Sequence, residues 1–489
     1  MKKRFLFMSL IALLGTFMLT SCNKEYTITL QSNNPAYGTV AGGGTYAAGT
    51  EVTIMATPAQ GYYFNNWSDG NYENPRVIKI KGNMTLIATF SDQPGHGGGE
   101  GGGEGTGEAE TLNGTMDQNR TLIDKGLPID YVIDGTLYID GNACLTIQPG
   151  VTIAFTGVDG HIIVSENAGL KMVGTAEKHI RFQGPINNNN VGSWGYVEYR
   201  SRRTDNQMEY VDFINGGSNE DFGVILLENG AKVSMKHCTI DGSFGYGIRP
   251  WYDEPDFYAF ENNTIRNCAQ SPIMINNALM LNHVDTGNVF ENNGKNYIWY
   301  SGYVADNDAT FANHGIPYFF DRWVDIRTKM VVDAGVTLLM AEQTSLQVSE
   351  EGMLQVNGTA DNPVVIRSVV DEPGAWKGIV CQSHKTIQGG NYIHHAVISG
   401  CGYDESACVE TYWDGTINLE NVSLNGSGYG LSMSLPGDWE DDVWVYDWSQ
   451  SPIKGSNITY NCTLGNVRVG DEVFDGSQLP APSKRHARK

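Results

Sequence analysis

Basic residues are scarce in this chain of 489 residues, which has 32 lysines and arginines against 55 aspartates and glutamates. Three of the basic residues, Lys2, Lys3 and Arg4, precede an apolar run at the N-terminus. Cleavage after that run would take the formal net charge from −23 to about −26 (−23 − 3). The field of such a polyanion repels nucleic acid and anionic headgroups. The composition therefore argues against both as partners and favours a neutral, cationic or calcium-bridged partner.

Cysteine is also infrequent, with only eight residues in the chain. Seven of them follow Cys22, namely Cys144, Cys238, Cys268, Cys381, Cys401, Cys408 and Cys462. Seven is an odd number, and a chain of this length can build a core without disulfides. We therefore expect most of these cysteines to be small buried apolar residues, with Cys401 and Cys408 as the one pair that bridges.

The N-terminus carries an export signal. The apolar run Phe5–Leu19 follows the basic residues and ends in "LTSC", whose cysteine is Cys22. This order is typical of a cleaved signal peptide, here over residues 1–21. The end of the run resembles the lipobox of bacterial lipoproteins, which implies lipidation of Cys22, and Asn23-Lys24-Glu25 resembles a surface-export signal. We expect a lipoprotein of the outer membrane, exposed at the cell surface, that touches the membrane only through its lipid anchor.

A glycine- and glutamate-rich run, "QPGHGGGEGGGEGTGEAE", predicts a flexible acidic linker over residues 93–111. Before it, residues 22–92 alternate apolar and polar residues in short runs separated by Gly, Asn and Pro, which predicts a small β-domain. The stretch from "GTVAGGGTYAAG" through "GYYFNNWSDG" to "NMTLIATF" resembles the divergent internalin-type B-repeat of bacterial surface proteins. This resemblance implies a spacer or adhesive module without chemistry of its own.

After the linker, one phrase recurs at steps of 27, 25 and 25 residues (240 − 213, 265 − 240, 290 − 265). Its apolar residues are Phe213, Ile240, Ile265 and Phe290, and two positions after each stands Asn or Gly. This spacing is typical of a solenoid whose coils stack strand on strand into parallel sheets. Asn and Gly suit the turns because they tolerate left-handed backbone. The pattern predicts an all-β fold, a right-handed parallel β-helix, and resembles the pectin-lyase-like superfamily.

The β-helix, predicted over residues 112–476, contains an internal duplication. "LTIQPGVTIAF" at Leu145 returns as "MVVDAGVTLLM" at Met330, 185 positions later (330 − 145), and the recurring phrase returns around Ile398 and Leu424. The two copies span about 127–300 and 316–476, and residues 477–489 are predicted to be a disordered tail. The segments that precede the two sets of coils share turn residues and aliphatics but no pair of acid, base or metal ligands, so the repeat is architectural. No linker composition separates them, which favours one continuous helix.

The stretch most suggestive of binding is "GDWEDDVWVYDWSQS", from Gly437. In a strand, Trp444, Tyr446 and Trp448 would share one face and form a platform for sugar rings, with Trp439 close by. The neighbouring acids Asp438, Asp441 and Asp442 would supply hydroxyl contacts or a calcium site. In the alternative, the aromatic side chains pack on the helix flank and the acids are solvated.

Two further tryptophans, Trp251 and Trp299, interrupt coil edges elsewhere in the chain. They would extend the same carbohydrate-binding surface if they lay on the same side of the helix. The sequence alone does not place them.

The fold by itself does not decide between a binding protein and an enzyme. Lyases of this shape need a group that neutralises the uronate and a Lys, Arg or His/Tyr base, and hydrolases need paired carboxylates. No run of this sequence resembles either motif, so we assign no catalytic residue. We expect a monomeric surface protein that binds an extracellular glycan or protein, with calcium as the only cofactor considered. The alternatives are a polysaccharide lyase or glycoside hydrolase with a site assembled from distant residues, and a structural envelope protein.

Overall fold

The structure of the protein is a computed structural model that describes residues 24–481, apart from 60–61, 69–73, 92–107, 186–187, 189, 229, 252–254, 305–306, 350, 371, 383–389 and 441–442. The chain divides into two compact units, Met1–Gly102 and Gly103–Lys489. The predicted lipidation site, Cys22, lies outside the described residues. Within those residues, no helix is both long enough and apolar enough to cross a membrane.

The first unit is a small β-domain. Its strands are β1 (Glu25–Ser32), β2 (Gly38–Ala41), β3 (Gly44–Ala47), β4 (Glu51–Pro58), β5 (Tyr63–Trp67), β6 (Arg76–Lys79) and β7 (Met84–Ser91). They form two sheets, β3-β1-β7-β5 and β2-β4-β6. Alternating residues such as Ile54 and Leu86 point into one core around Trp67, which is fully buried. Trp67 is therefore a core residue of this unit.

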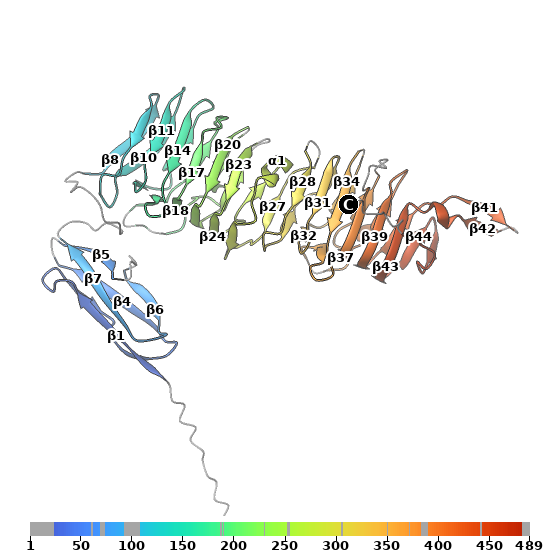
Figure 1. Cartoon of the computed structure of the whole chain (residues 1–489), viewed down its shortest axis with the longest axis horizontal. Helices are drawn as coiled ribbons and strands as arrows, with labels where there is room; N and C mark the ends of the chain where they lie inside the picture. Colours follow the sequence, from blue (N-terminus) through green and yellow to red (C-terminus); the bar gives the residue numbers. More distant parts are fainter. Residues whose placement is uncertain are drawn as a thin grey trace, which may run out of the picture. The chain divides into compact units, whose positions relative to one another are not determined.

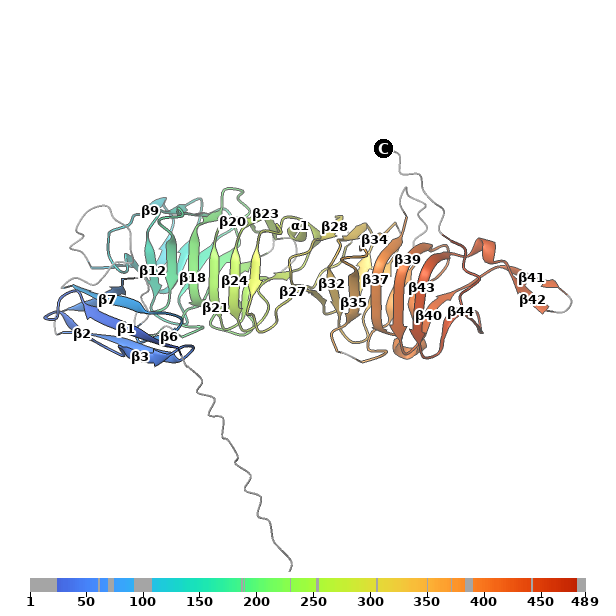
Figure 2. The same cartoon turned by 60° about the horizontal axis from the view of Figure 1, so that its bottom comes forward.

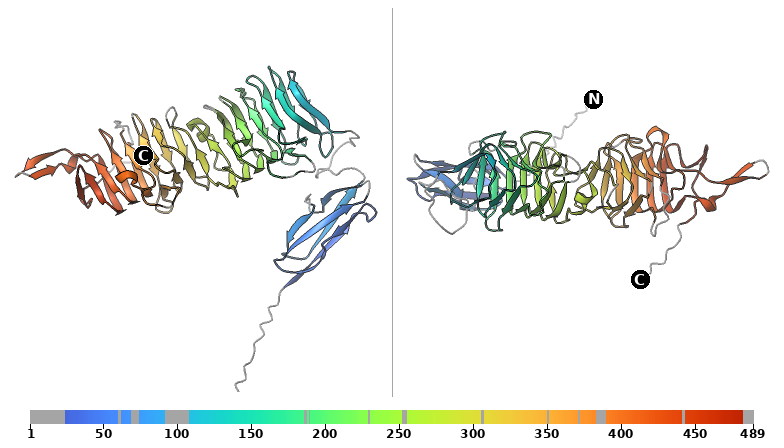
Figure 3. Two further views of the ribbon diagram at one scale, coloured as in Figure 1. Left: turned by 180° about the vertical axis from the view of Figure 1, so that it is seen from behind. Right: turned by 90° about the horizontal axis from the view of Figure 1, so that it is seen from above.

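The second unit is a parallel β-helix whose coils stack from β8 to β44, as Figures 1 and 3 show. In its first half each coil has three faces. The first face contains β12 (Thr152–Phe155), β15 (Ile180–Gln183), β18 (Val211–Gly216), β21 (Thr239–Ser243), β24 (Thr264–Cys268) and β26 (Val289–Glu291). The second face contains β13 (His161–Val164), β16 (Val197–Tyr199), β19 (Gly223–Leu227) and β22 (Tyr246–Pro250). The third face contains β9 (Arg120–Leu122), β11 (Cys144–Ile147), β14 (Gly169–Val173), β17 (Gln207–Glu209), β20 (Lys232–Lys236) and β23 (Asp256–Glu261).

Two longer strands, β8 (Glu110–Met116) and β10 (Tyr131–Ile139), open the helix and bend across the first and second faces. β8 begins inside the segment that the sequence predicts to be linker. A short helix, α1 (Ala278–Asn282), lies between β25 (Met274–Ile275) and β26 in the chain, close to the middle of the stack (Figure 2).

The second face continues into the second half of the helix through one isolated bridge between two sheets. A parallel bridge between Ile248 and Ile273 joins β22 to the next coil. The face then runs through β25 (Met274–Ile275), β27 (Ile298–Tyr300), β29 (Tyr318–Phe320), β32 (Thr337–Met340) and β35 (Val364–Ser368). It ends on the C-terminal parts of β37 (Tyr392–Cys401), β39 (Ile417–Gly426) and β43 (Ile453–Cys462).

The N-terminal parts of β37, β39 and β43 follow a separate row of strands, β28 (Ala309–Phe311), β31 (Lys329–Val332) and β34 (Met353–Asn357). The remaining row contains β30 (Val324–Ile326), β33 (Ser345–Val348), β36 (Gly378–Cys381), β38 (Ala407–Thr411), β40 (Tyr429–Met433), β44 (Gly465–Val469) and β45 (Glu472–Phe474). Short 3-10 helices are η1 (Tyr403–Glu405) and η2 (Trp448–Gln450), and β41 (Gly437–Glu440) pairs with β42 (Val443–Tyr446) in a hairpin. One hydrophobic core runs through this unit from Leu112 to Val469.

The predicted register of the coils is confirmed. Phe213 pairs with Ile240, Ile240 with Ile265, and Ile265 with Phe290, all in parallel strands of the first face. The turn residues that follow have the expected left-handed backbone, with φ of 57° at Asn215, 86° at Gly242, 58° at Asn267 and 55° at Asn292. Stacking of like residues therefore explains the 25-residue spacing.

Corresponding strands of the two copies lie on different faces of the helix, so the second copy is rotated by one face relative to the first. The strand β12 belongs to the first face, whereas its counterpart β32 follows β22, β25, β27 and β29 on the second face. Equivalent residues of the two copies consequently point to different sides of the helix. Any site on the second face is built from non-equivalent strands.

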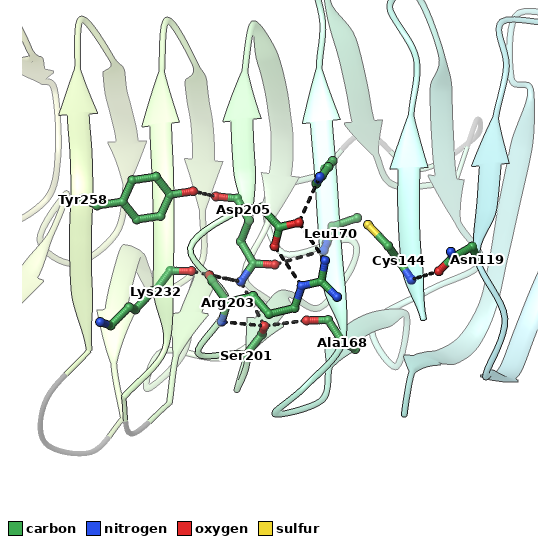
Figure 4. A network of polar contacts seen from close by, with 11 residues as sticks. Asn119, Cys144, Ala168, Leu170, Ser201, Arg203, Asp205, Lys232 and Tyr258 are labelled. Atoms are coloured by element: carbon green, nitrogen blue, oxygen red, sulfur yellow. Dashed lines mark hydrogen bonds and ion pairs between the residues drawn. The ribbon is translucent and has the colours of Figure 1, made fainter. Parts of the chain in front are cut away.

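Buried asparagines connect neighbouring coils on the third face through side-chain hydrogen bonds to the backbone. The Asn206 side chain accepts a hydrogen bond from the Leu170 N–H and donates to the carbonyl oxygens of Arg203 and Lys232, each over 3.0 Å. Figure 4 labels the partners Leu170, Arg203 and Lys232. The side chains of Arg203 and Asp205 form a two-bond ion pair of 2.8 and 2.7 Å. The network satisfies backbone groups at the coil turns, so we assign it a structural role.

Cys401 and Cys408 form the expected disulfide, and the other cysteines after Cys22 are free.

The start of the predicted disordered tail, residues 477–481, is instead ordered, because Leu479 packs on the core and the Pro480 carbonyl accepts the Gly455 N–H over 3.0 Å. Residues 482–489 lie outside the described residues.

Candidate functional site

The predicted aromatic platform is only partly realised. Trp439 and Trp444 face each other across the β41–β42 hairpin with ring centroids 5.6 Å apart, and Trp444 lies 6.4 Å from Tyr446. The strand prediction is wrong at Trp448, because Asp447 accepts the Ser449 N–H over 3.0 Å and turns the chain into η2. The ring of Trp448 packs against Phe474, with centroids 5.1 Å apart. The hairpin therefore presents two tryptophans and a tyrosine.

The acidic residues of this stretch do not form a described metal site. Asp438 is exposed, and Asp441 and Asp442 lie outside the described residues. In the part of the chain that the structure describes, no three His, Cys, Asp or Glu side chains are grouped so that they could hold a metal ion. Calcium binding by these three aspartates stays a prediction.

Trp251 and Trp299 lie elsewhere, on the second face. Trp299 is the middle residue of β27, and Trp251 directly follows β22. β27 lies near the middle of the stack, whereas the β41–β42 hairpin lies beyond the last coils (Figures 1 and 2). These two tryptophans therefore do not extend the hairpin surface.

Trp251 and Trp299 instead belong to a larger group of rings on the outside of the second face. We call this group the aromatic strip, and it consists of Tyr246, Trp251, Tyr297, Trp299 and Phe319. Ring centroids lie 5.9 Å apart for Tyr246 and Trp299, 5.5 Å for Trp299 and Phe319, and 4.8 Å for Tyr297 and Phe319. Parallel pairing of Trp299 with Phe319 on adjacent coils places these rings side by side. The strip thus follows the helix axis.

Arg249 lies at the N-terminal end of the strip, beside Tyr246 and Trp251. Its guanidinium carbon lies 5.2 Å from the Tyr246 ring centroid and 5.0 Å from that of Trp251, within cation–π range. Two of its nitrogens, Nε and Nη1, are buried and have no hydrogen-bond partner among the described residues, and the same holds for Trp299 Nε1. Buried donors without acceptors are costly, so these three donors mark a polar part of the strip whose hydrogen bonds are not satisfied by described residues.

The phenols of the strip are neutral at physiological pH. Burial raises the pKa of Tyr297 to about 12, and burial also raises the pKa of Tyr246. Both hydroxyl groups therefore keep their protons and can donate or accept hydrogen bonds. Lys295 adds a cation 5.2 Å from the Trp299 ring centroid.

At its N-terminal end the strip continues into a cluster of ionisable groups. Trp251 contacts Phe222, Phe222 contacts Tyr196, and the rings of Tyr196 and His161 stack at 4.1 Å. Burial lowers the pKa of His161, so its imidazole is neutral, and its Nδ1 has no partner within the described part of the chain. Beside this pair, Glu198 forms an ion pair with Arg200. A His–Tyr pair beside a carboxylate is the arrangement nearest to an acid–base site on this face.

Sequence reasoning missed Arg249, Tyr246 and Phe319 as parts of one surface. A signal for the strip is present, because Arg249, Met274 and Trp299 follow one another at 25 residues (274 − 249, 299 − 274). Each stands nine positions after a core residue of the repeating phrase (249 − 240, 274 − 265, 299 − 290). Residues at the repeat spacing occupy the same row of the helix, whether they point inward or outward.

Comparison with known families matches two regions of the chain. Residues 28–94 match the divergent InlB B-repeat domain, and residues 114–242 match the pectate-lyase-like beta helix domain. No curated protein and no solved structure matches the chain. The resemblances of the small β-domain and of the β-helix noted in the sequence are confirmed over these two regions.

Proposed function

We propose that this protein is a cell-surface lipoprotein that binds an extracellular glycan through the aromatic strip of its β-helix. In this proposal lipidated Cys22 anchors the chain, the small β-domain is a spacer, and the β-helix carries the recognition surface. The export signal and the B-repeat match support the first two parts. The observation that carries the third is the row of rings that begins beside Arg249, with the buried donors of Arg249 and Trp299.

The chemistry of the strip suits sugars. The apolar C–H faces of a sugar ring pack on aromatic side chains, and its hydroxyl oxygens accept hydrogen bonds from buried donors. Arg249 Nε, Arg249 Nη1 and Trp299 Nε1 are three buried donors beside the rings that have no partner among the described residues. Because tryptophan and arginine dominate binding energies at interfaces, we expect Trp299 and Arg249 to contribute about 2 kcal/mol or more each.

A glycan array with the purified protein tests this proposal. The Trp299→Ala and Trp251→Ala variants should lose binding. Trp413→Ala is the matched control, since Trp413 is 78% exposed and follows β38 outside the second face. The Trp444→Ala variant tests the hairpin separately. Binding that survives in the strip variants but disappears in Trp444→Ala would move the site to the hairpin, and binding that survives in all of them would contradict both locations.

A second candidate function is that of a polysaccharide lyase, which the cluster of His161, Tyr196, Glu198 and Arg200 favours. These residues are distant in sequence from Trp299 but join the strip through Phe222 and Trp251. Incubation with a panel of acidic polysaccharides should then release unsaturated ends, detected by ultraviolet absorbance, in the parent but not in His161→Ala. No unsaturated product from any substrate would reject the lyase function.

A further inference from the structure

The outward row that carries the aromatic strip continues into the second half of the helix. Phe319 pairs with Leu339 and Leu339 with Arg367 on successive coils. Arg367 in turn pairs with Ser399, Ser399 with Asn425, and Asn425 with Asn461. The row thus changes from aromatic to polar side chains along one face.

The polar part of this row lines a cavity of about 320 Å³, which we call the polar cleft. Its lining includes Arg367, Glu372, Ser399, Asn425, Asn461 and Thr463. This volume is near the lower end of the range of about 300–1,000 Å³ that is typical of small-molecule sites. The cleft can therefore hold a small ligand or one segment of a polymer.

The side chains of the cleft have unused hydrogen-bonding capacity. Arg367 donates one hydrogen bond, over 2.9 Å, to the Ser368 carbonyl oxygen, and it makes no ion pair with a described residue. By contrast, Arg203 and Arg266 each pair with an aspartate. Asn425 donates to Ser423 Oγ over 3.3 Å, which leaves its Oδ1 free to accept. Such groups can form hydrogen bonds with the donors and acceptors of a polar ligand.

The charge of the cleft indicates which kind of polar ligand fits. Among the described lining residues, Arg367 contributes one positive charge and Glu372 one negative charge. The other polar lining groups are amides and hydroxyls, beside the apolar Val370 and Pro373, and the whole chain has a formal net charge of −23. This environment suits a neutral, hydroxyl-rich ligand better than a polyanion.

One wall of the cleft is held rigid. A side chain at Gly426 would place its Cβ 3.1 Å from both sulfurs of the Cys401–Cys408 disulfide and 2.6 Å from the Cys401 carbonyl oxygen. The disulfide thus packs directly behind the backbone that lines the cleft. Rigid support of this kind preorganises a binding site.

We propose that the polar cleft is a second sugar subsite, and that strip and cleft bind one neutral polysaccharide chain lying along the helix axis. This proposal rests on the proposed function, because it takes the aromatic strip to be a glycan site. Five coil steps separate Trp299 from Asn425 in the paired row. At about 4.8 Å per step they span about 24 Å. The ligand is therefore a polymer, since a short oligosaccharide cannot reach both subsites.

Affinity electrophoresis in gels that contain soluble mannan, arabinoxylan or β-glucan tests this inference, with polygalacturonate as the acidic comparator. The double variant Arg367→Ala with Asn425→Ala should weaken retention by the neutral polymer at least about tenfold, because several hydrogen bonds are lost. The same variant should bind a disaccharide of that polymer as the parent does. Asn461→Ala provides a second, smaller change in the cleft.

Arg181→Ala is the matched control, since Arg181 is an exposed arginine of the first face whose Nε donates to Gln183 over 3.0 Å. It should leave retention unchanged. Retention that depends on Trp299 but not on the cleft residues would overturn the second subsite and leave the proposed function standing. Stronger retention by polygalacturonate would overturn the neutral ligand class, and no retention by any polymer would overturn both proposals.

Discussion

The asparagines buried between coils should be essential for stability, and Asn263 provides the sharpest test. Its side chain is fully buried, accepts the Cys238 N–H over 2.9 Å and donates to the Met235 carbonyl oxygen over 3.0 Å. Leucine at this position would leave that buried donor and that buried acceptor without partners. Each unsatisfied group costs about 1–3 kcal/mol, so Asn263→Leu should destabilise the β-helix by about 2–6 kcal/mol.

Urea unfolding followed by tryptophan fluorescence measures this change as a shift of the midpoint. Asn282→Leu is the matched control, because Asn282 also accepts a backbone N–H, from Thr310 over 2.9 Å, and donates to a backbone carbonyl, that of Asp308 over 2.6 Å. Asn282 is exposed, so water can replace its bonds and the cost should stay below about 1 kcal/mol. Equal midpoints for the two variants would contradict the expectation that burial raises the free-energy cost of losing the asparagine hydrogen bonds.

Three further predictions concern the disulfide and two titrating groups. Replacing Cys401 and Cys408 together by serine removes a bridge of sequence separation 7 and should cost about 2.5 kcal/mol of unfolding free energy by loop entropy, and an unchanged urea midpoint would argue against this. Burial lowers the pKa of His314 to about 4, so stability should fall as pH drops below about 6.5, and His314→Gln should flatten this part of a pH series of melting temperatures. The hydrogen bonds from Arg203 hold the pKa of Asp205 well below its usual range, so its stabilisation should be present above about pH 3.9 and be lost on further acidification. Asp205→Asn should therefore lower the urea midpoint at pH 7 more than at pH 2, and equal shifts would contradict this.

Much of the fold was predictable because successive coils of a solenoid place similar residues at a regular spacing. The spacing of Phe213, Ile240, Ile265 and Phe290 predicts the register, since like residues stack in adjacent coils. The rotation of the second copy by one face was not predictable. It depends on the short strands and the helix between β24 and β31, whose residues do not follow the 25-residue phrase.

The candidate site was harder to predict because outward residues leave a weaker pattern than core residues. Trp299 was singled out, but its neighbour Phe319 stands 20 positions later (319 − 299), where the coil is shorter. The strand prediction at Trp448 is wrong because the Asp447 side chain caps the short helix η2. The alternation of aromatic residues in this stretch gives no sign of this local hydrogen bond. A search for polar or aromatic residues at a fixed offset from the core residue would have found Arg249 and Trp299 together.

Calorimetric titration of the purified protein with the polysaccharide that binds best on the array measures whether the aromatic strip is the glycan site. Trp299→Ala should bind at least about thirtyfold more weakly than the parent, and Trp413→Ala should bind like the parent. Equal affinities of Trp299→Ala and the parent would contradict the claim that the aromatic strip is the glycan site.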